Sequence, residues 1–547
     1  MLREALGRRA GATGARTGTG TATATATATG TATGIGTGAR AGRPGRRLRA
    51  WLPGLVRRHR LFSVVLGLSV VPRVIVMLGF QPAVLFKLDS YDYLWDAAHL
   101  RPNPVNPGGY TVFLWLLAPL RSLTLIAALQ HLAGLAVAIM VYAVLRRFGV
   151  RPWIATLACV PVLFDPAQFL LEQLIMADML ALLLMVAAFA VLLLRDRPSV
   201  PRSAVAGLLM GASAVVRPTA LPLIAALAVY LLAKRAGWRR VCALLAAGAL
   251  PVVAYMSWFA AVYGSFNLTN SNGLFLWSRT MSFADCATIK PPADLLALCP
   301  NRQPGAPAAG RLLPKQYLWN HSAWQWKSPA VPAGIVPDTA AFTPANNARA
   351  LRFAVKAIEA QPIGYAGAVA RDVAIPFLSA DMFAFPGTQP ALSSLGASNR
   401  RYALAAVQAY AGSTAGIGPY LGHHLGTRLQ EPYAHLIRGY QRVIFLPGPV
   451  FALIVAIGLA GILIPRRRSG AAVLLWACTV VTVVLPIAEH EYTYRYVIPA
   501  VPLACMAAAL AWAYHPAAGP AGDGAGAASP EPGTAASAPG AAAGAAD

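Results

Sequence analysis

The sequence is short of charge. Of its 547 residues only 12% are Asp, Glu, Lys or Arg, whereas 57% are hydrophobic. Soluble domains carry roughly a quarter charged residues, so this composition excludes an ordinary soluble protein. Acidic residues are the scarcer of the two charged classes, with 20 Asp and Glu against 46 Lys and Arg. The net charge of +26 does not indicate nucleic-acid binding, because much of the excess lies in the N-terminal tail and in short clusters between apolar runs, the pattern of cytoplasmic loops.

Long apolar runs take the place of the missing charge. Runs of roughly 18 or more apolar residues are long enough to cross a hydrocarbon core of about 30 Å. We predict an all-α polytopic membrane protein with about ten transmembrane helices. The expected spans are 61–80, 123–145, 152–165, 171–194, 204–216, 219–233, 241–262, 443–464, 471–487 and 496–514. Basic clusters then fall on the side of the basic N-terminus, which places both termini in the cytoplasm.

One apolar stretch allows two interpretations. Arg217-Pro218 divides residues 204–233 into two short halves. A single kinked helix would put the flanking basic clusters on opposite faces, so a hairpin is favoured.

The ends of the chain have little sequence complexity. Gly, Ala and Thr dominate residues 11–40, and Ala, Gly, Pro and Ser dominate the last thirty or so residues. Such segments cannot bury enough apolar surface to fold. We therefore expect a disordered basic cytoplasmic tail at 1–59, a transmembrane core at 60–263 with an outer loop at 81–122, an extracytoplasmic loop region at 264–442, C-terminal transmembrane helices at 443–515 and a disordered cytoplasmic tail at 516–547. A cleaved signal peptide is not expected, because the first apolar run begins only near Leu61.

The ionisable residues outside the basic loops gather on the predicted outer face. Ionisable residues at a membrane edge are costly to bury and usually face a functional cavity. They are Asp89 and Asp92 in the first outer loop, Glu172 and Asp178 at the start of a span, Arg217 at the hairpin, and Glu489, His490, Glu491 and Arg495 in the last outer turn. Arg73 lies inside the first span, where pairing with an acid is one option, and the sequence does not assign its role.

Four motifs on this face resemble those of the GT-C superfamily, the membrane glycosyltransferases that take sugars from polyprenyl-phosphate carriers. They are Asp89-Ser-Tyr-Asp-Tyr with Asn106-Pro-Gly-Gly-Tyr110, Leu171-Glu-Gln-Leu-Ile-Met-Ala-Asp178, Val216-Arg-Pro-Thr-Ala220 and Tyr494-Arg-Tyr-Val-Ile-Pro499. The likeness covers about residues 60–265 and 485–515, and its nearest types are the protein mannosyltransferases and aminoarabinose transferases. It implies a seven-helix core, which the first seven expected spans match.

The resemblance also implies roles. It places the general base in the first outer loop, at Asp89, with Asp178 as a second catalytic candidate. Arg217 and Arg495 suit a phosphate, because each guanidinium offers a fork of donors. Asp92, Glu172 and His490 complete the substrate-binding candidates.

Each role has a structural alternative. Asp92 rivals Asp89 as base, Asp178 could pair an arginine within the bundle, and Glu172 could stabilise a helix start. Arg217 and Arg495 could be interfacial arginines whose heads reach toward water.

The cofactor is not identified by the sequence. A divalent metal is one option, held by Asp89, Glu489 and His490, with Asp178 and Glu491 as further ligands. No tight ligand spacing supports it.

The middle region is basic and contains one clear element. Residues 346–360 predict an amphipathic helix, and 363–385 an interfacial or re-entrant segment. Cys286 and Cys299 are the only cysteines in a predicted loop. If that loop is extracytoplasmic it faces an oxidising compartment, so we expect a Cys286–Cys299 disulfide.

These features favour a glycosyltransferase of the bacterial plasma membrane. It would move a sugar from a polyprenyl-phosphate donor to a glycan, lipid or protein acceptor among membrane lipids. The alternative is a non-catalytic lipid-linked glycan transporter or flippase, but the chain shows no internal repeat of the kind transporters often have. Other lipid-dependent transfer, such as acyl transfer, would need a nucleophile or a tight metal cluster, which the sequence does not show.

Overall fold

The computed structural model describes residues 56–86, 89–300, 311, 313–318, 342–379, 406, 427–464, 469–511 and 513. All but a few residues of the predicted tail at 1–59, and the whole predicted tail at 516–547, lie outside these residues. The chain divides into the units Met1–Arg58 and His59–Asp547. Everything below concerns the second unit.

Nearly all described secondary structure is helical, as predicted. The first expected span is two helices, α2 (Arg60–Leu68) and α3 (Val70–Gly79), separated at Ser69. After the short strand β1 (Phe80–Gln81) the first loop forms α4 (Asp89–His99) and the short apolar helix α5 (Gly109–Leu117). The strand β1 pairs antiparallel with β2 (Arg428–Leu429) from the distant C-terminal half.

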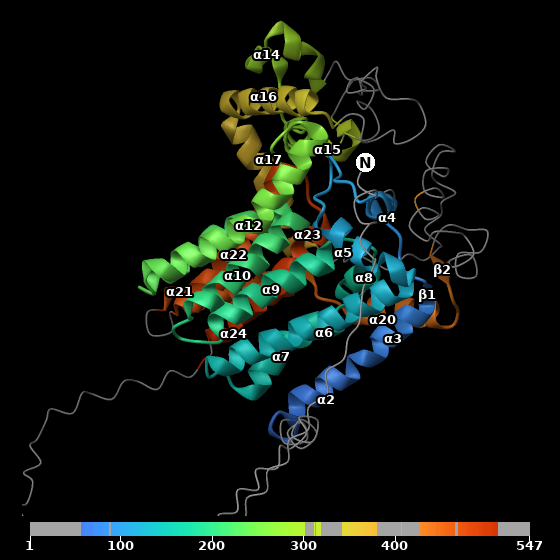
Figure 1. Ribbon diagram of the computed structural model, residues 1–547, viewed down its shortest axis with the longest axis vertical. Helices are drawn as coiled ribbons and strands as arrows, with labels where there is room; N and C mark the ends of the chain where they lie inside the picture. Colours follow the sequence, from blue (N-terminus) through green and yellow to red (C-terminus); the bar gives the residue numbers. More distant parts are fainter. Residues whose placement is uncertain are drawn as a thin grey trace, which may run out of the picture. The chain divides into compact units, whose positions relative to one another are not determined.

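Long helices pack side by side in the centre of the unit. They are α6 (Leu123–Arg147), α9 (Asp178–Leu193), α10 (Val200–Val216) and α12 (Trp238–Tyr263), which Figure 1 shows as neighbours. Glycines bring α10 close to α12, since a Cβ at Gly207 would overlap with the carbonyl of Leu244. Between α10 and α12 lies α11 (Leu221–Ala233). The predicted division of residues 204–233 at Arg217-Pro218 is therefore confirmed.

Two breaks shape the segment that leads to α9. The helices α7 (Pro152–Phe164) and α8 (Pro166–Gln173) meet at a bend of 53°. Pro166 causes this bend, because proline has no N–H to continue the helical ladder. A second break follows at residues 174–177, so α9 begins at Asp178. The predicted helix 171–194 was wrong at its start, because an apolar run does not reveal a break within it.

A lobe outside the bundle holds the middle of the chain. It contains α13 (Asn272–Thr280), α14 (Cys286–Ile289), α15 (Pro314–Gln316) and α16 (Pro344–Ala360), and Figure 1 shows α14 and α16 together. The next helix, α17 (Pro362–Leu378), leads from the lobe to the bundle and packs on its C-terminal helices. Trp277 and Phe353 lie in its separate apolar core. The predicted amphipathic helix is confirmed as α16, and the predicted Cys286–Cys299 disulfide is present. The end of the predicted segment 363–385 lies outside the described residues.

The C-terminal part returns to the bundle. Its helices are α20 (Tyr433–Val443), α21 (Gly448–Leu463), α22 (Gly470–Glu489), α23 (Tyr494–Val497) and α24 (Val501–Leu510). In the part of the chain that the structure describes, four helices are long and apolar enough to cross a membrane, or up to six if each of two bent pairs is one span. Shorter apolar helices occupy the other expected spans. The architecture is that of a multi-pass membrane protein, and the total of about ten crossings stays a prediction.

Candidate active site

Two carboxylates of the candidate site open helices. Asp89 is the first residue of α4, and Asp178 is the first residue of α9. An acid is favoured in the first turn because the N-terminal end of a helix carries partial positive charge. The break at 174–177 is thus what sets Asp178 at the edge of the bundle rather than within a continuous helix.

Two arginines come from turns far apart in the sequence. Arg217 follows the last residue of α10 with an extended backbone, because the next residue, Pro218, disfavours the helical conformation before it. Arg495 lies in α23, just after the turn that ends α22. The tertiary fold brings both side chains to the two carboxylates.

The four side chains form one cluster. Arg217 Nη2 donates to Asp178 Oδ2 at 2.7 Å, and Arg495 Nη1 lies 3.8 Å from the same oxygen. Arg495 Nη2 is 3.5 Å from Asp89 Oδ2. The Asp178 side chain is 3% exposed, whereas that of Asp89 is 36% exposed. Asp178 therefore serves the two arginines, and Asp89 remains open to a ligand.

The arginines are not saturated by protein. Among the described residues, buried Arg217 Nε and buried Arg495 Nε and Nη1 have no hydrogen-bond partner. The Arg495 guanidinium also lies over the ring of Phe86, 4.4 Å from its centroid, a contact that favours a cation. Buried donors without acceptors are costly, so this cluster suits an anion that accepts several hydrogen bonds.

A cavity of about 1420 Å³ opens beside this cluster. Most of the residues predicted for the site line it: Asp89, Asp92, Asp178, Arg217, Glu489, His490, Glu491 and Arg495. A volume of this size exceeds what a single sugar phosphate needs, so the cavity has room for a second reactant.

His490 lines the cavity and contacts α13 of the lobe. Its Nδ1 is 3.0 Å from Ser278 Oγ, and its ring stacks on Phe275. Burial lowers the pKa of His490 to about 3, with Arg279 and Lys315 adding to the effect. The ring is neutral at ordinary pH and can act as a hydrogen-bond partner there.

Glu491 lies beside His490 and faces a lysine. Its carboxylate is 3.8 Å from Lys315 Nζ. Burial raises the pKa of Glu491, and the nearby lysine opposes that shift.

The metal option finds no support in the geometry. Within the described ranges, no three His, Cys, Asp or Glu side chains come close enough to hold a metal ion. Asp89, Glu489 and His490 line one cavity without forming a ligand cluster.

Glu172 is the one predicted site residue that the fold takes elsewhere. Its side chain is fully buried in α8 and makes a bidentate ion pair with Arg73 of α3, with both distances 2.9 Å. It does not line the cavity, so its expected contact with substrate is not seen. The partner of Arg73, unassigned from sequence, is this carboxylate.

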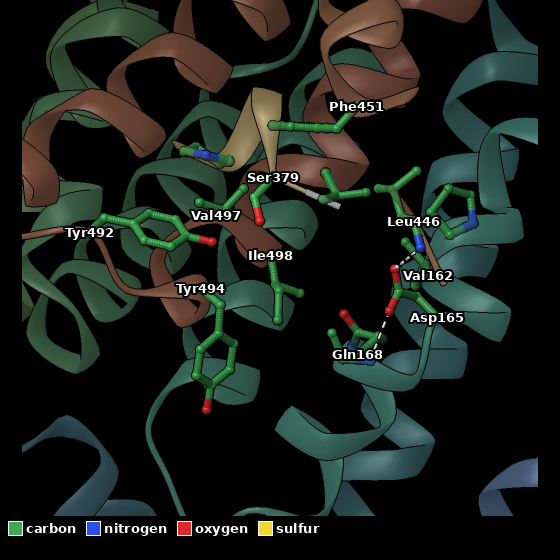
Figure 2. A pocket seen from close by; sticks show the side chains of 14 residues that line it. Val162, Asp165, Gln168, Ser379, Leu446, Phe451, Tyr492, Tyr494, Val497 and Ile498 are labelled. Carbon is green, nitrogen blue, oxygen red and sulfur yellow. Dashed lines mark hydrogen bonds between the residues drawn. The ribbon is translucent and has the colours of Figure 1, made fainter. Parts of the chain in front are cut away.

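A smaller, mainly apolar pocket of about 40 Å³ adjoins the cavity. Tyr492 and Tyr494 line both spaces. Figure 2 shows these tyrosines on one side of the pocket and Asp165 with Leu446 on the other. Asp165 accepts from the backbone N–H of Leu446 at 3.1 Å, which ties the end of α7 to the turn between α20 and α21.

Several lining residues were missed by sequence analysis. They are Phe86, Thr269, Ser271, Asn272, Lys315, Gln316 and Tyr365. Most belong to the lobe, whose neutral polar residues carry no local signal. Only the fold shows that they reach the same cavity as Asp89.

Comparison with known proteins gives one family-model match. Residues 121–214 match the model described as dolichyl-phosphate-mannose-protein mannosyltransferase. This segment runs from the start of α6 into α10 and contains Asp178, but not Asp89, Arg217 or Arg495. A comparison with curated proteins gives no match.

Solved structures give distant likenesses. The Saccharomyces cerevisiae protein O-mannosyltransferase Pmt1-Pmt2 complex bound to its sugar donor matches at 16% identity and a TM-score of 0.32, over 41% of this chain and 36% of that chain. The oligosaccharyltransferase AglB from Archaeoglobus fulgidus matches at 12% identity and 0.34, over 82% and 50%. ArnT from Cupriavidus metallidurans, bound to undecaprenyl phosphate, matches at 16% identity and 0.30, over 82% and 76%.

This chain thus spans about a third to a half of the length of the first two of these structures. At such TM-scores the likenesses carry no conclusion of their own. The family-model match confirms the resemblance to GT-C glycosyltransferases predicted from the motifs, over residues 121–214.

Proposed function

We propose that this protein is a membrane glycosyltransferase that moves a sugar from a polyprenyl-phosphate carrier to a cell-envelope glycan, glycolipid or protein. One observation carries the proposal. Beside Asp89 and Asp178, Arg217 and Arg495 have buried guanidinium nitrogens without hydrogen-bond partners among the described residues, in a cavity large enough for two reactants. The match of residues 121–214 to a family that uses a lipid-linked mannose donor supports the same reaction class.

The arginines would bind the phosphate of the donor. Charge-assisted hydrogen bonds from a guanidinium fork suit phosphate oxygens. As the sugar leaves, the bridging oxygen gains negative charge, and donors already in place stabilise that charge without reorganising. Asp178 holds Arg217 at 2.7 Å and so fixes the direction of its remaining donors.

Asp89 would act as the general base. Its carboxylate is the more exposed of the two and lines the cavity. It would take the proton of the acceptor hydroxyl while that oxygen attacks the anomeric carbon. The bond between the anomeric carbon and the phosphate oxygen breaks at the same time, and the polyprenyl phosphate leaves. Asp92, also in the lining, is the rival for this role.

The surroundings suit a lipid-linked donor. The smaller pocket adds apolar surface next to the cavity, against which the start of a carrier chain would pack. The Cys286–Cys299 disulfide supports an oxidising compartment for the lobe. We propose that the site lies on the outer face of a bacterial plasma membrane, with both termini cytoplasmic, as the basic clusters of the sequence predict.

A gene deletion tests this proposal without knowledge of the acceptor. The measurement is the amount of each polyprenyl-phosphate sugar in the membrane, together with the sugar content of the envelope. Loss of the enzyme should leave its donor unused, so that one polyprenyl-phosphate sugar accumulates and one envelope sugar disappears. The wild-type gene should reverse both changes.

Complementation with variants then tests the base. Asp89→Asn should give no recovery, because loss of a positioned base costs about 10²–10⁴-fold in rate, while Asp92→Asn should recover. Recovery by Asp89→Asn and not by Asp92→Asn would move the base to Asp92. Unchanged lipid and envelope profiles after deletion would rule out the proposed function.

A further inference from the structure

A second arginine–carboxylate cluster lies in the bundle, away from the cavity. Arg73 uses all five of its N–H groups: two donate to the Glu172 carboxylate at 2.9 Å, and three donate to backbone carbonyls. Two of these carbonyls, of Val162 and Leu163, belong to the end of α7, where the bend at Pro166 leaves them without helical partners. The cation therefore completes the hydrogen bonding of this bend.

Glu172 is equally saturated. Besides Arg73, His131 Nδ1 lies 2.7 Å from its Oε2, and Gln168 Nε2 donates to its Oε1 at 3.0 Å. The carboxylate lies directly against α6 at Gly134, where a Cβ would overlap with Oε1. Glycine at this position makes the close approach possible.

The same cluster holds the break between α8 and α9. Gln130 Nε2 of α6 donates to the carbonyls of Glu172 and Leu174, at 2.9 and 2.7 Å. Gln173 bonds to His131 through its Oε1 and to the carbonyl of Phe80 through its Nε2. The backbone that leads to Asp178 is thereby fixed from α6 and from β1.

The segment that leads to Asp89 is attached to this break. Val84 N–H donates to the carbonyl of Gln173 at 2.9 Å, and Ile175 N–H donates to the carbonyl of Val84 at 3.0 Å. Next to Asp89, Ser90 Oγ donates to the carbonyl of Ile175 at 2.9 Å and accepts from Phe86 N–H at 2.8 Å. One set of hydrogen bonds thus joins the two chain segments that end in the site carboxylates.

We propose that Arg73, Glu172, Gly134 and Ser90 are positioning residues that set Asp89 and Asp178 relative to each other. None of the four lines the cavity, so they act through the helix starts that they hold. The proposal rests on the function proposed above for the two carboxylates. Catalytic rates are sensitive to displacements of about 1 Å, so a shift of this attachment would reach the reaction without touching a reactant.

Two variants test the two ends of this hydrogen-bond set, a mild one beside Asp89 and a more disruptive one beside Glu172. Ser90→Ala removes the hydroxyl beside Asp89 and leaves every charge in place. We expect turnover to fall roughly tenfold to a hundredfold, with KM for the lipid donor unchanged, because the arginines do not move. Gly134→Ala pushes on the Glu172 carboxylate and so shifts Asp178 with its bound Arg217. We expect both turnover and KM to change.

A matched control distinguishes positioning from lost stability. Phe189 lies in the apolar core on α9 and does not line the cavity. Phe189→Leu should lower the melting temperature by at least as much as Ser90→Ala while turnover stays within about twofold. Equal loss of turnover in this control and in Ser90→Ala would reduce Ser90 to a residue that only stabilises the fold.

A second readout does not depend on enzyme activity. Val84 and Leu174 are partners in a parallel backbone bridge, so a Val84→Cys, Leu174→Cys protein should form a disulfide on mild oxidation. Adding Gly134→Ala should slow this crosslinking about tenfold or more, while adding Phe189→Leu should not. An unchanged crosslinking rate in the Gly134→Ala background would overturn the proposed attachment. If Gly134→Ala slows crosslinking but the wild-type protein transfers no sugar, the proposed function is wrong and the proposed attachment still holds.

Discussion

Two clusters of arginine and carboxylate occupy this bundle, and they differ in how fully their polar atoms are used. Around Glu172, all five donors of Arg73 are bonded, and the carboxylate receives four hydrogen bonds. Around Asp178, three buried guanidinium nitrogens of Arg217 and Arg495 lack hydrogen-bond partners among the described residues. Buried polar groups are nearly always paired in folded proteins. We therefore assign the saturated cluster to the framework and propose that the unsaturated one, which lines the cavity, binds a ligand.

Exposure follows the same division. The Glu172 side chain is fully buried, whereas that of Asp89 is 36% exposed and lines the cavity. A carboxylate that acts on a substrate needs access to it, and one that only fixes a helix bend does not. Arginine–carboxylate pairs thus occur in two settings in this bundle, and the number of hydrogen bonds that each side chain makes distinguishes them.

The largest expected effect comes from removing the carboxylate of the saturated cluster. Glu172→Leu leaves Arg73 buried without its counter-ion, a change that typically costs about 3–5 kcal/mol of stability. Asp89→Asn should cost less than about 1 kcal/mol, because Asp89 is partly exposed and 3.5 Å from its arginine. Free energies of unfolding in mixed micelles would compare the two. Similar losses in both variants would remove the distinction between framework and site.

The sequence predicted the unsaturated cluster better than the saturated one. Asp178 and Arg217 are visible as charges beside apolar runs, and a membrane topology with a common outer face is enough to bring such charges together. Glu172 is visible in the same way, but its destination depends on Arg73, 99 residues earlier in the chain. Spacing along a sequence does not encode such a pair.

The break that positions Asp178 was also hidden. Residues 174–177 read Leu-Ile-Met-Ala, a sequence that would suit a helix interior. The helix is interrupted because tertiary partners from α6 and from residues 80–90 take its backbone groups. The helix division at Arg217 was predictable, since Pro218 acts locally. The disulfide was predictable too, since Cys286 and Cys299 are the only two cysteines outside the predicted spans.

The disulfide offers a change that affects stability but neither cluster. Replacing Cys286 and Cys299 with serine opens a link between residues 13 apart, which should cost roughly 3 kcal/mol in the chain-entropy model. The loss should be confined to the lobe, as followed by hydrogen exchange of α14 and α16. Affinity for a polyprenyl phosphate should stay as in the wild type. Weaker lipid binding would mean that the lobe contributes to the phosphate site.

A smaller, pH-dependent effect is expected at His490. Its folded-state pKa is lowered to about 3 by burial, so the neutral ring stabilises the fold above its ordinary pKa of about 6.5. This contribution falls as the pH drops below 6.5, by up to about 1.4 kcal/mol per pH unit. The difference in unfolding free energy between wild type and His490→Gln, measured from pH 7.5 to 5, should shrink accordingly. A difference that does not vary with pH would show that the pKa of His490 is not lowered in the folded protein.

The central claim is that the unsaturated arginines bind a lipid phosphate, and binding measures it most directly. In lipid nanodiscs, the wild-type protein should bind a polyprenyl phosphate more tightly than the matching polyprenol. Arg217→Ala and Arg495→Ala should each weaken phosphate binding by about 1.5–3 kcal/mol, and lysine at either position should recover part of it, because the fork is lost. Arg352→Ala, at an exposed surface ion pair outside the cavity, should change nothing. Equal affinity for phosphate and alcohol, or an unchanged preference in both alanine variants, would contradict the account.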